Sequence, residues 1–180
     1  MLGYDLFEDA ETIDISLLIQ SAPSTVSIVY DASAETEVLT DDSTILANDL
    51  IATAGTRKDC VAFVSPTVSM KTATDVLAWA SPLTKSSYAF ADSGALYIYD
   101  KYNDTYRWVS ASGSTAGLAA NADLVADPWF SPAGFSRGGI RNVTKLAWNP
   151  NQVDRDDLYK KGVNPIVSFP GQGTIPVSYT

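Results

Sequence analysis

The chain has 180 residues, of which 46% are hydrophobic and 11% aromatic, so it is a folding chain with enough apolar residues for one sizeable core. Its net charge of −9 argues against direct nucleic-acid binding, because that binding depends on basic side chains that neutralise phosphates. The chain has no histidine, which excludes Ser-His-Asp and Cys-His catalysis and the histidine-containing zinc motifs. No apolar run approaches the roughly 20 residues of a membrane span, so we expect no membrane insertion.

The charge is divided unevenly along the chain. Residues 1–100 contain 15 acidic and 4 basic side chains, whereas residues 101–180 contain 6 and 8. This asymmetry fits a subunit with opposed faces that stacks head to tail with copies of itself. The simpler interpretation is a solvated acidic N-terminal region. The single cysteine, Cys60, lies in the apolar run CVAFV, and we interpret it as a small buried hydrophobic residue.

The first half of the chain reads as alternating strands and helices. The apolar run at 14–20 and the β-branched run at 26–30 predict strands, the second of them within a polar segment, 21–42, that we treat as a possible variable insertion. A helix is expected from the cap residues at 41–44 to Gly55, taken as its end. The run VAFVS at 61–65 is typical of a central strand covered on both faces, and we expect a second helix at 70–80.

The second half continues the alternation but interrupts it once. We expect helices and strands at the following positions: helices 112–125 and 153–161, and strands 88–91, 95–100, 106–110, 143–148 and 165–169. Residues 95–110 break the pattern and predict an antiparallel hairpin. The sequence therefore predicts a single α/β domain over residues 1–180, with a mixed, largely parallel sheet, helices on both faces, and the hairpin at an edge of the sheet or protruding from it.

The sequence contains no recognisable motif for a ligand-binding or catalytic site. The phosphate-binding glycine patterns GxGxxG and GxxxxGK[ST] are absent. The acidic run that begins at Asp154 resembles the start of a calcium loop, but Tyr159 and Pro165 occupy the positions of its glycine and glutamate. Acidic residues in the first turn of a helix explain that run better. We expect no catalytic residues, no cofactor and no metal.

The most unusual segment is DPWFSPAGFSRGGIRNV, residues 127–143. Its prolines and glycines indicate a fixed crossover from a helix to a strand. We assign four residues to anchoring the loop by packing: Trp129, Phe130, Pro132 and Gly134. The two arginines, Arg137 and Arg141, are left for partners, and we expect them to form inter-subunit salt bridges to the acidic N-terminal half.

Several motifs in order along the chain resemble those of one known family. They are Arg107-Trp108-Val109, Ser112-Gly113 with Ala116-Gly117, Asp123, Pro128-Trp129 with Pro132-Ala133-Gly134, and the segment VNPIVSFPGQGT at 163–174. Together these resemble the central conserved region of the tail sheath proteins of contractile-tail bacteriophages, the myoviruses. Either of the last two motifs alone would be weak evidence for the family, but the two together are fairly specific for it.

The resemblance implies a structural virion protein and not an enzyme. Sheath subunits are assembled in the host cytoplasm as a homo-oligomer around the tail tube, and the sheath contracts to drive the tube through the host envelope for genome ejection. The implied partners are other sheath subunits, the tail tube protein and the baseplate, with neighbours linked by strand addition. The chain ends where the family continues into a large C-terminal domain, so we expect a fragment that stays monomeric if assembly needs the missing part.

A second hypothesis is a carbohydrate- or receptor-binding module of a phage appendage. The expected hairpin carries a cluster of aromatic residues: Tyr97, Tyr99, Tyr102, Tyr106 and Trp108. Aromatic rings stack on sugars, but alternating aromatics on a hairpin also form cross-strand pairs. A third hypothesis, an enzyme, would need a mechanism based on carboxylates or a metal with no visible motif.

Overall fold

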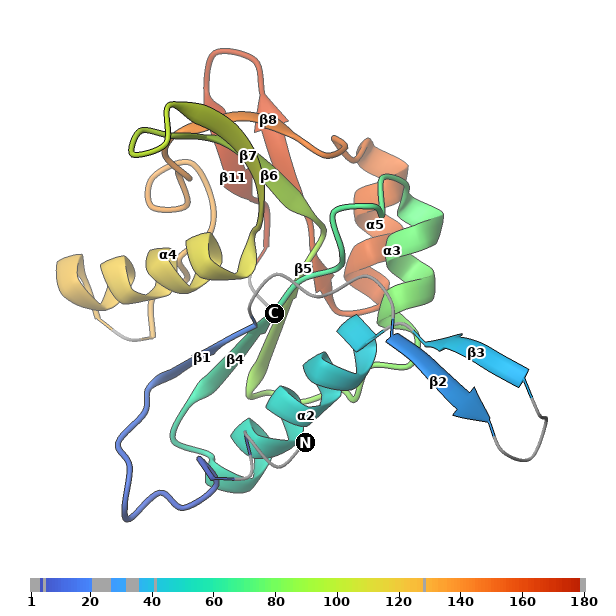
Figure 1. The fold of residues 1–180 in the computed structure, drawn as a ribbon. Helices are drawn as coiled ribbons and strands as arrows, with labels where there is room; N and C mark the ends of the chain where they lie inside the picture. Colours follow the sequence, from blue (N-terminus) through green and yellow to red (C-terminus); the bar gives the residue numbers. More distant parts are fainter. Residues whose placement is uncertain are drawn as a thin grey trace.

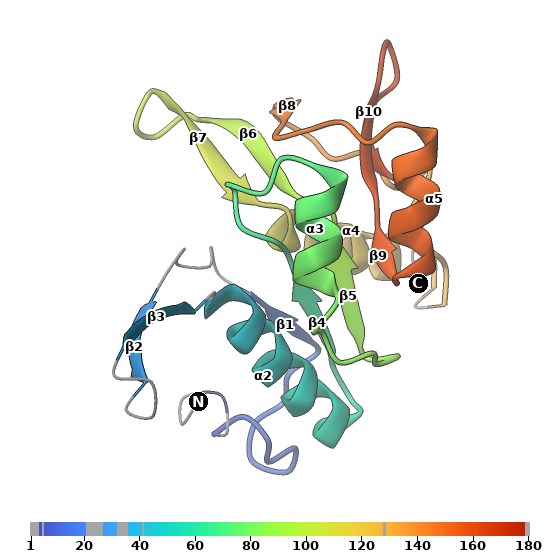
Figure 2. The same ribbon diagram turned by 90° about the vertical axis from the view of Figure 1, so that its right-hand side faces the viewer.

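The structure is a computed structural model that describes residues 4, 6–20, 27–31, 36–40, 42–127 and 129–178, with the backbone alone at 27–31, 36–40 and 42. Pro128 of the family-like motif lies outside the described residues, as does much of the segment 21–42. In the described part of 21–42, β2 (Ser27–Asp31) and β3 (Thr36–Thr40) form an antiparallel pair. This pair lies apart from the main sheet (Figures 1 and 2).

A parallel sheet of four strands forms the centre of the fold. Its order is β1 (Leu17–Ile19), β4 (Val61–Val64), β5 (Ala89–Asp92) and β9 (Val163–Asn164). Helices α2 (Asp42–Arg57), α3 (Ala73–Ala80) and α5 (Gln152–Lys160) cover one face, and α4 (Ser112–Val125) covers the other (Figure 1). The predicted α/β class with helices on both faces is therefore confirmed.

Alternating side chains of β4 divide the core between the two faces. Ala62 and Val64 are fully buried and pack with Leu50 of α2 and Val76 of α3. Phe63 points the other way, where its ring lies 5.5 Å from that of Phe90 under α4. A strand buried on both faces must be apolar at every position, which is why VAFV identifies it in the sequence.

A second layer of antiparallel strands lies beyond the parallel sheet (Figure 2). The strands β6 (Ala95–Asp100), β7 (Thr105–Ser110) and β8 (Val143–Leu146) form a sheet in the order β7-β6-β8. The hairpin of β10 (Ile166–Phe169) and β11 (Gly173–Pro176) packs beside it, with Ile166 and Leu96 in a shared apolar cluster. The predicted hairpin at 95–110 is confirmed.

The expected end of α2 needs correction, whereas α4 has the predicted bounds 112–125. Helix α2 does not stop at Gly55 but continues to Arg57. Its left-handed terminal residue is Lys58, with φ of 64° and an N–H that donates to the Ala54 carbonyl at 2.9 Å, so a lysine takes the position that glycine usually fills. Helix α4 begins after Ala111, an N-cap residue that has no side-chain acceptor. The hydroxyl of Ser112, the first residue of the helix, donates to the Gln20 carbonyl.

The start of α5 shows what the acidic run does. Asn151 accepts from the Asp154 N–H, and the Asp154 carboxylate accepts from the Asn151 N–H, each at 3.0 Å. This reciprocal capping box satisfies two backbone donors that the first turn leaves without partners. The acidic run therefore serves helix initiation, as the sequence indicates.

Arg57, at the C-terminal end of α2, fixes the acidic N-terminal segment to the body. Its buried guanidinium donates to the backbone carbonyls of Phe7 (2.7 Å), Ile13 (2.8 Å) and Asp9 (3.3 Å). The same group pairs with Asp59, with N–O distances of 2.9 and 2.8 Å, and this pairing lowers the pKa of the Asp59 carboxyl. One cation thus satisfies three carbonyls of a segment that has no regular secondary structure of its own.

We predict that Arg57→Met releases the segment 6–15 without unfolding the core. Amide exchange in this segment should accelerate by about tenfold or more, because its opening no longer breaks charged hydrogen bonds. Hydrogen exchange read by mass spectrometry measures this directly. The matched control is Lys58→Met at the adjacent exposed lysine, and equal exchange in the two variants would contradict the role of Arg57.

Candidate functional site

The carboxyl edge of the parallel sheet, where α/β proteins usually bind ligands, is filled by polar side chains of the protein itself. Gln20 directly follows β1, Ser65 directly follows β4, and Asp92 is the last residue of β5. All three side chains are buried. The Gln20 side chain accepts from the Ser65 N–H at 2.9 Å and donates to the Ser43 carbonyl at 3.2 Å. These bonds connect two strand ends and the start of α2.

Ser65 and Ser112 complete this buried junction, which we define as Gln20, Ser65, Asp92 and Ser112. The Ser65 hydroxyl donates to the Asp92 carboxylate and accepts from the Ser112 N–H at 2.8 Å. The Ser112 hydroxyl donates to the Gln20 carbonyl at 2.8 Å, and the other Asp92 oxygen accepts from Gly94 N–H at 3.1 Å. The polar groups satisfy one another, so this edge offers a ligand no unsatisfied donor or acceptor among them.

Complete burial makes the Asp92 carboxyl a weaker acid than an exposed one. Desolvation raises the pKa of its carboxyl from 3.8 to about 7, although the hydrogen bonds from Ser65 and Gly94 act in the opposite direction. Perturbed carboxyls often mark catalytic sites. Here the carboxyl is fully buried and accepts hydrogen bonds from Ser65 and Gly94. Its raised pKa therefore makes the stability of the fold depend on pH.

We predict that the free energy of unfolding falls as pH rises from about 4 to about 7. Unfolded Asp92 releases its proton near pH 4 and the folded form near 7, so the folded state binds more protons in this window. The steepest slope is about 1.4 kcal/mol per pH unit, and the slope vanishes above pH 7. Carboxyls whose pKa is lowered, such as Asp59, act in the opposite direction, but only below about pH 4.

Urea unfolding at a series of pH values tests this prediction. Asp92→Asn should remove the decrease between pH 4 and 7, because the amide has no proton to release in that range. Asp123→Asn, at an exposed position of α4, should leave the decrease intact. The assignment to Asp92 fails if the Asp92→Asn chain keeps the same slope.

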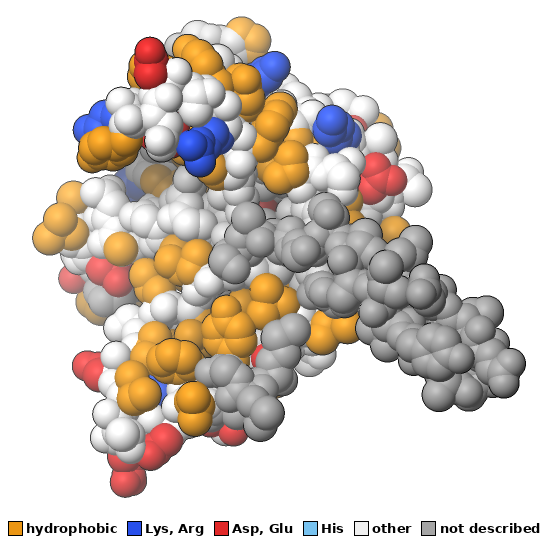
Figure 3. Space-filling model, viewed as in Figure 1, with side chains coloured by type: hydrophobic (Ala, Val, Ile, Leu, Met, Phe, Trp, Pro, Cys, Tyr) orange, Lys and Arg blue, Asp and Glu red, His pale blue; other side chains and the backbone are white. Residues whose placement is uncertain are grey.

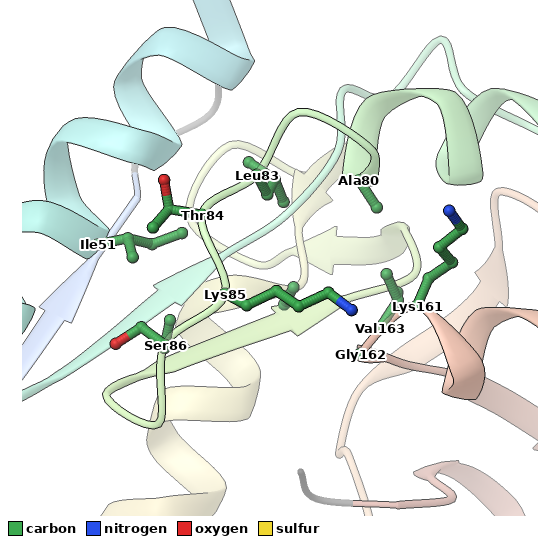
Figure 4. Close-up of a pocket in the computed structure, with 11 residues that line it drawn as sticks. Ile51, Ala80, Leu83, Thr84, Lys85, Ser86, Lys161, Gly162 and Val163 are labelled. Atoms are coloured by element: carbon green, nitrogen blue, oxygen red, sulfur yellow. The ribbon is translucent and has the colours of Figure 1, made fainter.

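A small cavity lies at the opposite end of the sheet, between β5, β9 and the helices on that face (Figure 4). Its volume is about 150 Å³, below the 300–1,000 Å³ of typical small-molecule sites. Its lining includes the apolar residues Ile51, Leu83 and Val163. The Lys85 side chain extends across the space between them, and Lys161 lies at one side (Figure 4). None of the described residues that line it is acidic.

The structure places two of the four expected loop anchors in solvent. Trp129 is 78% exposed and Phe130 is 40% exposed, so in this structure Trp129 does not supply the packing that the sequence interpretation assigns to it. The loop is held through its backbone instead. Gly134 N–H donates to the Pro176 carbonyl (3.1 Å), Gly138 N–H to Gly134 (2.8 Å), and Ile140 N–H to Thr174 (2.9 Å).

The other two expected anchors occupy positions that fit such a role. Pro132 is buried, and Gly134 has a φ of +85°, which favours glycine. Gly138 is a further residue that fixes the shape of this loop. A Cβ at this position would lie 2.7 Å from the Gly134 oxygen and 2.8 Å from the Gly134 nitrogen, so this turn has no space for a side chain.

We predict that two alanine substitutions in this loop change the stability of the protein by very different amounts. Trp129→Ala should change the free energy of unfolding by no more than about 0.5 kcal/mol, because an exposed ring loses little. Gly138→Ala should destabilise by about 1–3 kcal/mol, since the backbone of Gly134 must shift. Urea unfolding of both variants measures the difference, and a large loss in Trp129→Ala would restore the packing role.

The expected inter-subunit residues Arg137 and Arg141 lie beside an open groove between α4 and the loop. The groove encloses about 750 Å³, and its lining comprises Ser114, Gly117, Leu118, Asn121, Val125, Phe135, Ser136, Arg137, Gly139, Ile140 and Arg141. The Arg137 guanidinium lies over the Phe130 ring at 4.6 Å from its centroid. Among the described residues, neither arginine forms a salt bridge, so both charges are available to a partner.

The aromatic residues of the hairpin form cross-strand pairs. Tyr97 lies opposite Trp108 and Tyr99 opposite Tyr106, with ring centroids 4.8 and 5.1 Å apart. Tyr97 also stacks on Tyr106 at 5.4 Å, and the Lys145 ammonium lies 4.6 Å from the Tyr97 centroid. The rings are engaged with one another and with a cation, a geometry that favours the cross-strand interpretation over a sugar platform.

The described residues contain neither a metal-binding cluster nor a membrane-spanning helix. Within the described ranges, no group of three or more His, Cys, Asp and Glu side chains is placed to hold a metal ion. None of the described helices is long and apolar enough to cross a membrane. Cys60 is buried, as expected, and burial raises the pKa of its thiol.

Comparison with known proteins assigns the family. Residues 33–175 match the family described as the phage tail sheath protein central domain. The chain belongs to the phage tail sheath family. This is the family that the motifs of the sequence resemble.

Individual relatives agree with this assignment. The chain is 34% identical to the tail sheath proteins of Vibrio phage KVP40 and Enterobacteria phage T4, in each case over 97% of the chain and 27% of the relative. It is 39% identical to the tail sheath protein of Salmonella phage ViI over 66% of the chain and 20% of the relative. The chain thus spans about a quarter of the length of the curated relatives it matches.

Solved structures show the same fold at lower sequence identity. The contracted helical sheath of the anti-feeding prophage matches with a TM-score of 0.65 at 15% identity, over 97% of this chain and 41% of that one. A chain in the baseplate structure of the same system matches with a TM-score of 0.68 at 15% identity, over 97% and 40%. These similarities show a shared sheath fold.

Proposed function

We propose that this chain is the core of a sheath subunit that polymerises around the tail tube of a contractile phage and contracts to drive the tube through the host envelope. The match of residues 33–175 to the sheath central domain carries the proposal. Its partners are other sheath subunits, the tail tube protein and the baseplate. The helical sheath and baseplate structures of the anti-feeding prophage support such an assembly for a subunit of this fold.

In this function the chain acts as a rigid body and performs no reaction. The parallel sheet is buried on both faces, and the junction of Gln20, Ser65, Asp92 and Ser112 connects three strands to α4. A body tied together in this way transmits a displacement instead of deforming. Contraction is then a rearrangement of subunits at their interfaces, in which one set of contacts replaces another.

We infer that residues 1–180 form a single domain of a larger subunit and that 21–42 is a variable insertion in it. The family match begins at residue 33, inside this segment. The β2–β3 pair is a separate two-stranded sheet, whereas the expected core strands join the main layers. Arg137 and Arg141 remain candidate inter-subunit contacts, and the exposed Trp129 and Phe130 beside them join that surface.

Electron microscopy tests the proposed function. The chain should be expressed in the longest form that its gene encodes, concentrated, and examined by negative staining. Tubes or stacked rings of uniform diameter are the expected result, because sheath subunits polymerise through their own contacts. A protein of this full length that remains monomeric at its highest soluble concentration would refute the proposal.

A further inference from the structure

We propose that the groove between α4 and the loop 129–141 binds the acidic N-terminal loop, residues 6–14, of a second copy of this chain. This contact rests on the proposed sheath function and names both surfaces of one of its interfaces. The groove and the loop belong to the same chain, so the same contact repeats from copy to copy.

The groove has the chemistry to receive an acidic segment with apolar side chains. Leu118, Val125, Phe135 and Ile140 supply apolar surface, and none of the described residues that line the groove is acidic. Phe135 and Val125 are 62% and 63% exposed, so this surface is open to a partner. Arg137 and Arg141 add two positive charges with no acidic partner in the described part of the chain.

The acidic loop has the complementary chemistry. Residues 6–14 carry Glu8, Asp9, Glu11 and Asp14, all of them exposed. Leu6 in the same loop is 73% exposed, which provides an apolar side chain next to the carboxylates. Among the described residues, no lysine or arginine forms a salt bridge with these carboxylates.

The loop is also held in shape before binding. Arg57 binds the carbonyls of Phe7, Asp9 and Ile13, which directs the backbone inward and leaves the carboxylates outside. Asp9 caps the turn by accepting from the Glu11 N–H at 2.9 Å and from the Thr12 hydroxyl. A loop ordered by its own protein loses little conformational entropy when a partner binds it.

The two surfaces lie apart on the molecule. The acidic loop lies beyond the C-terminal end of α2, at the bottom of Figure 1, whereas the groove lies along α4. In the space-filling view, acidic side chains gather at that lower end and the basic side chains lie mainly in the upper part, where single acidic side chains also lie (Figure 3). Further acidic side chains are visible at the height of α4. A contact between two different patches is heterologous, so it propagates into an open helical array unless the rotation closes a ring.

A charge-swap experiment on the 180-residue chain tests this contact. One variant carries Arg137→Glu and Arg141→Glu, and the other carries Glu8→Lys and Glu11→Lys. The control carries Lys71→Glu and Lys101→Glu, at two exposed lysines outside both surfaces, and changes the net charge as much as the first variant does. Sedimentation velocity at low and raised salt measures self-association, and circular dichroism verifies that each variant is folded.

We expect each charge-swap variant to associate at least about tenfold more weakly than the unmodified chain, because reversed charges repel at the contact. The control should associate like the unmodified chain. An equimolar mixture of the two variants should regain association, since each then meets a complementary surface. Raised salt should weaken the unmodified contact.

Three outcomes would overturn the proposal: unchanged association of the folded variants, no recovery in the mixture, or a monomeric unmodified chain at its highest soluble concentration. In the first case another surface, or a segment of a longer chain, mediates assembly. Tubes formed by the longest gene product would still support the sheath function in each of these cases. The failure of this contact and the failure of the sheath function are therefore distinguishable.

Discussion

The structure depends on a closed set of buried hydrogen bonds where the parallel strands end. Gln20, Ser65 and Asp92 extend from β1, β4 and β5, and Ser112 brings the start of α4 to the same point. Buried polar groups cost free energy unless each has a partner, so the four side chains fix the relative positions of three strands and a helix. They also occupy the edge at which other α/β proteins bind their ligands. The core is thereby specialised for rigidity.

The charged side chains that could bind a partner lie at the surface, outside this junction. The Arg57 cation is buried and orders the acidic loop through its backbone carbonyls. Arg137 and Arg141 lie beside exposed apolar side chains along α4. A subunit that is negative at one place and positive with apolar surface at another is suited to directional association with copies of itself. The overall acidity of the chain conceals this division.

The elements that the sequence predicts best are those whose pattern has a local cause. The run VAFV is apolar at every position because β4 is covered on both faces, and the alternating aromatics of 95–110 follow from the two faces of a hairpin. The loop at 127–143 is recognisable by its prolines and glycines. Its anchors are less predictable: Trp129 is exposed, while the turn depends on Gly138, whose missing side chain admits the backbone of Gly134. Aromatic character alone does not distinguish a buried anchor from a contact for a partner.

The sequence by itself determined the α/β class, the order of its main elements, the absence of histidine chemistry and the family, because these follow from local periodicity, composition and ordered motifs. The tertiary structure alone decided which polar residues meet. Nothing near Arg57 in the sequence indicates that it binds carbonyls some 44–50 residues away, and the proximity of Ser65 to Asp92 and Ser112 arises from three separate strand and helix ends. Such contacts depend on how the layers of the fold pack together. Residues that meet over long distances in the sequence follow no periodic pattern, so the sequence does not reveal them.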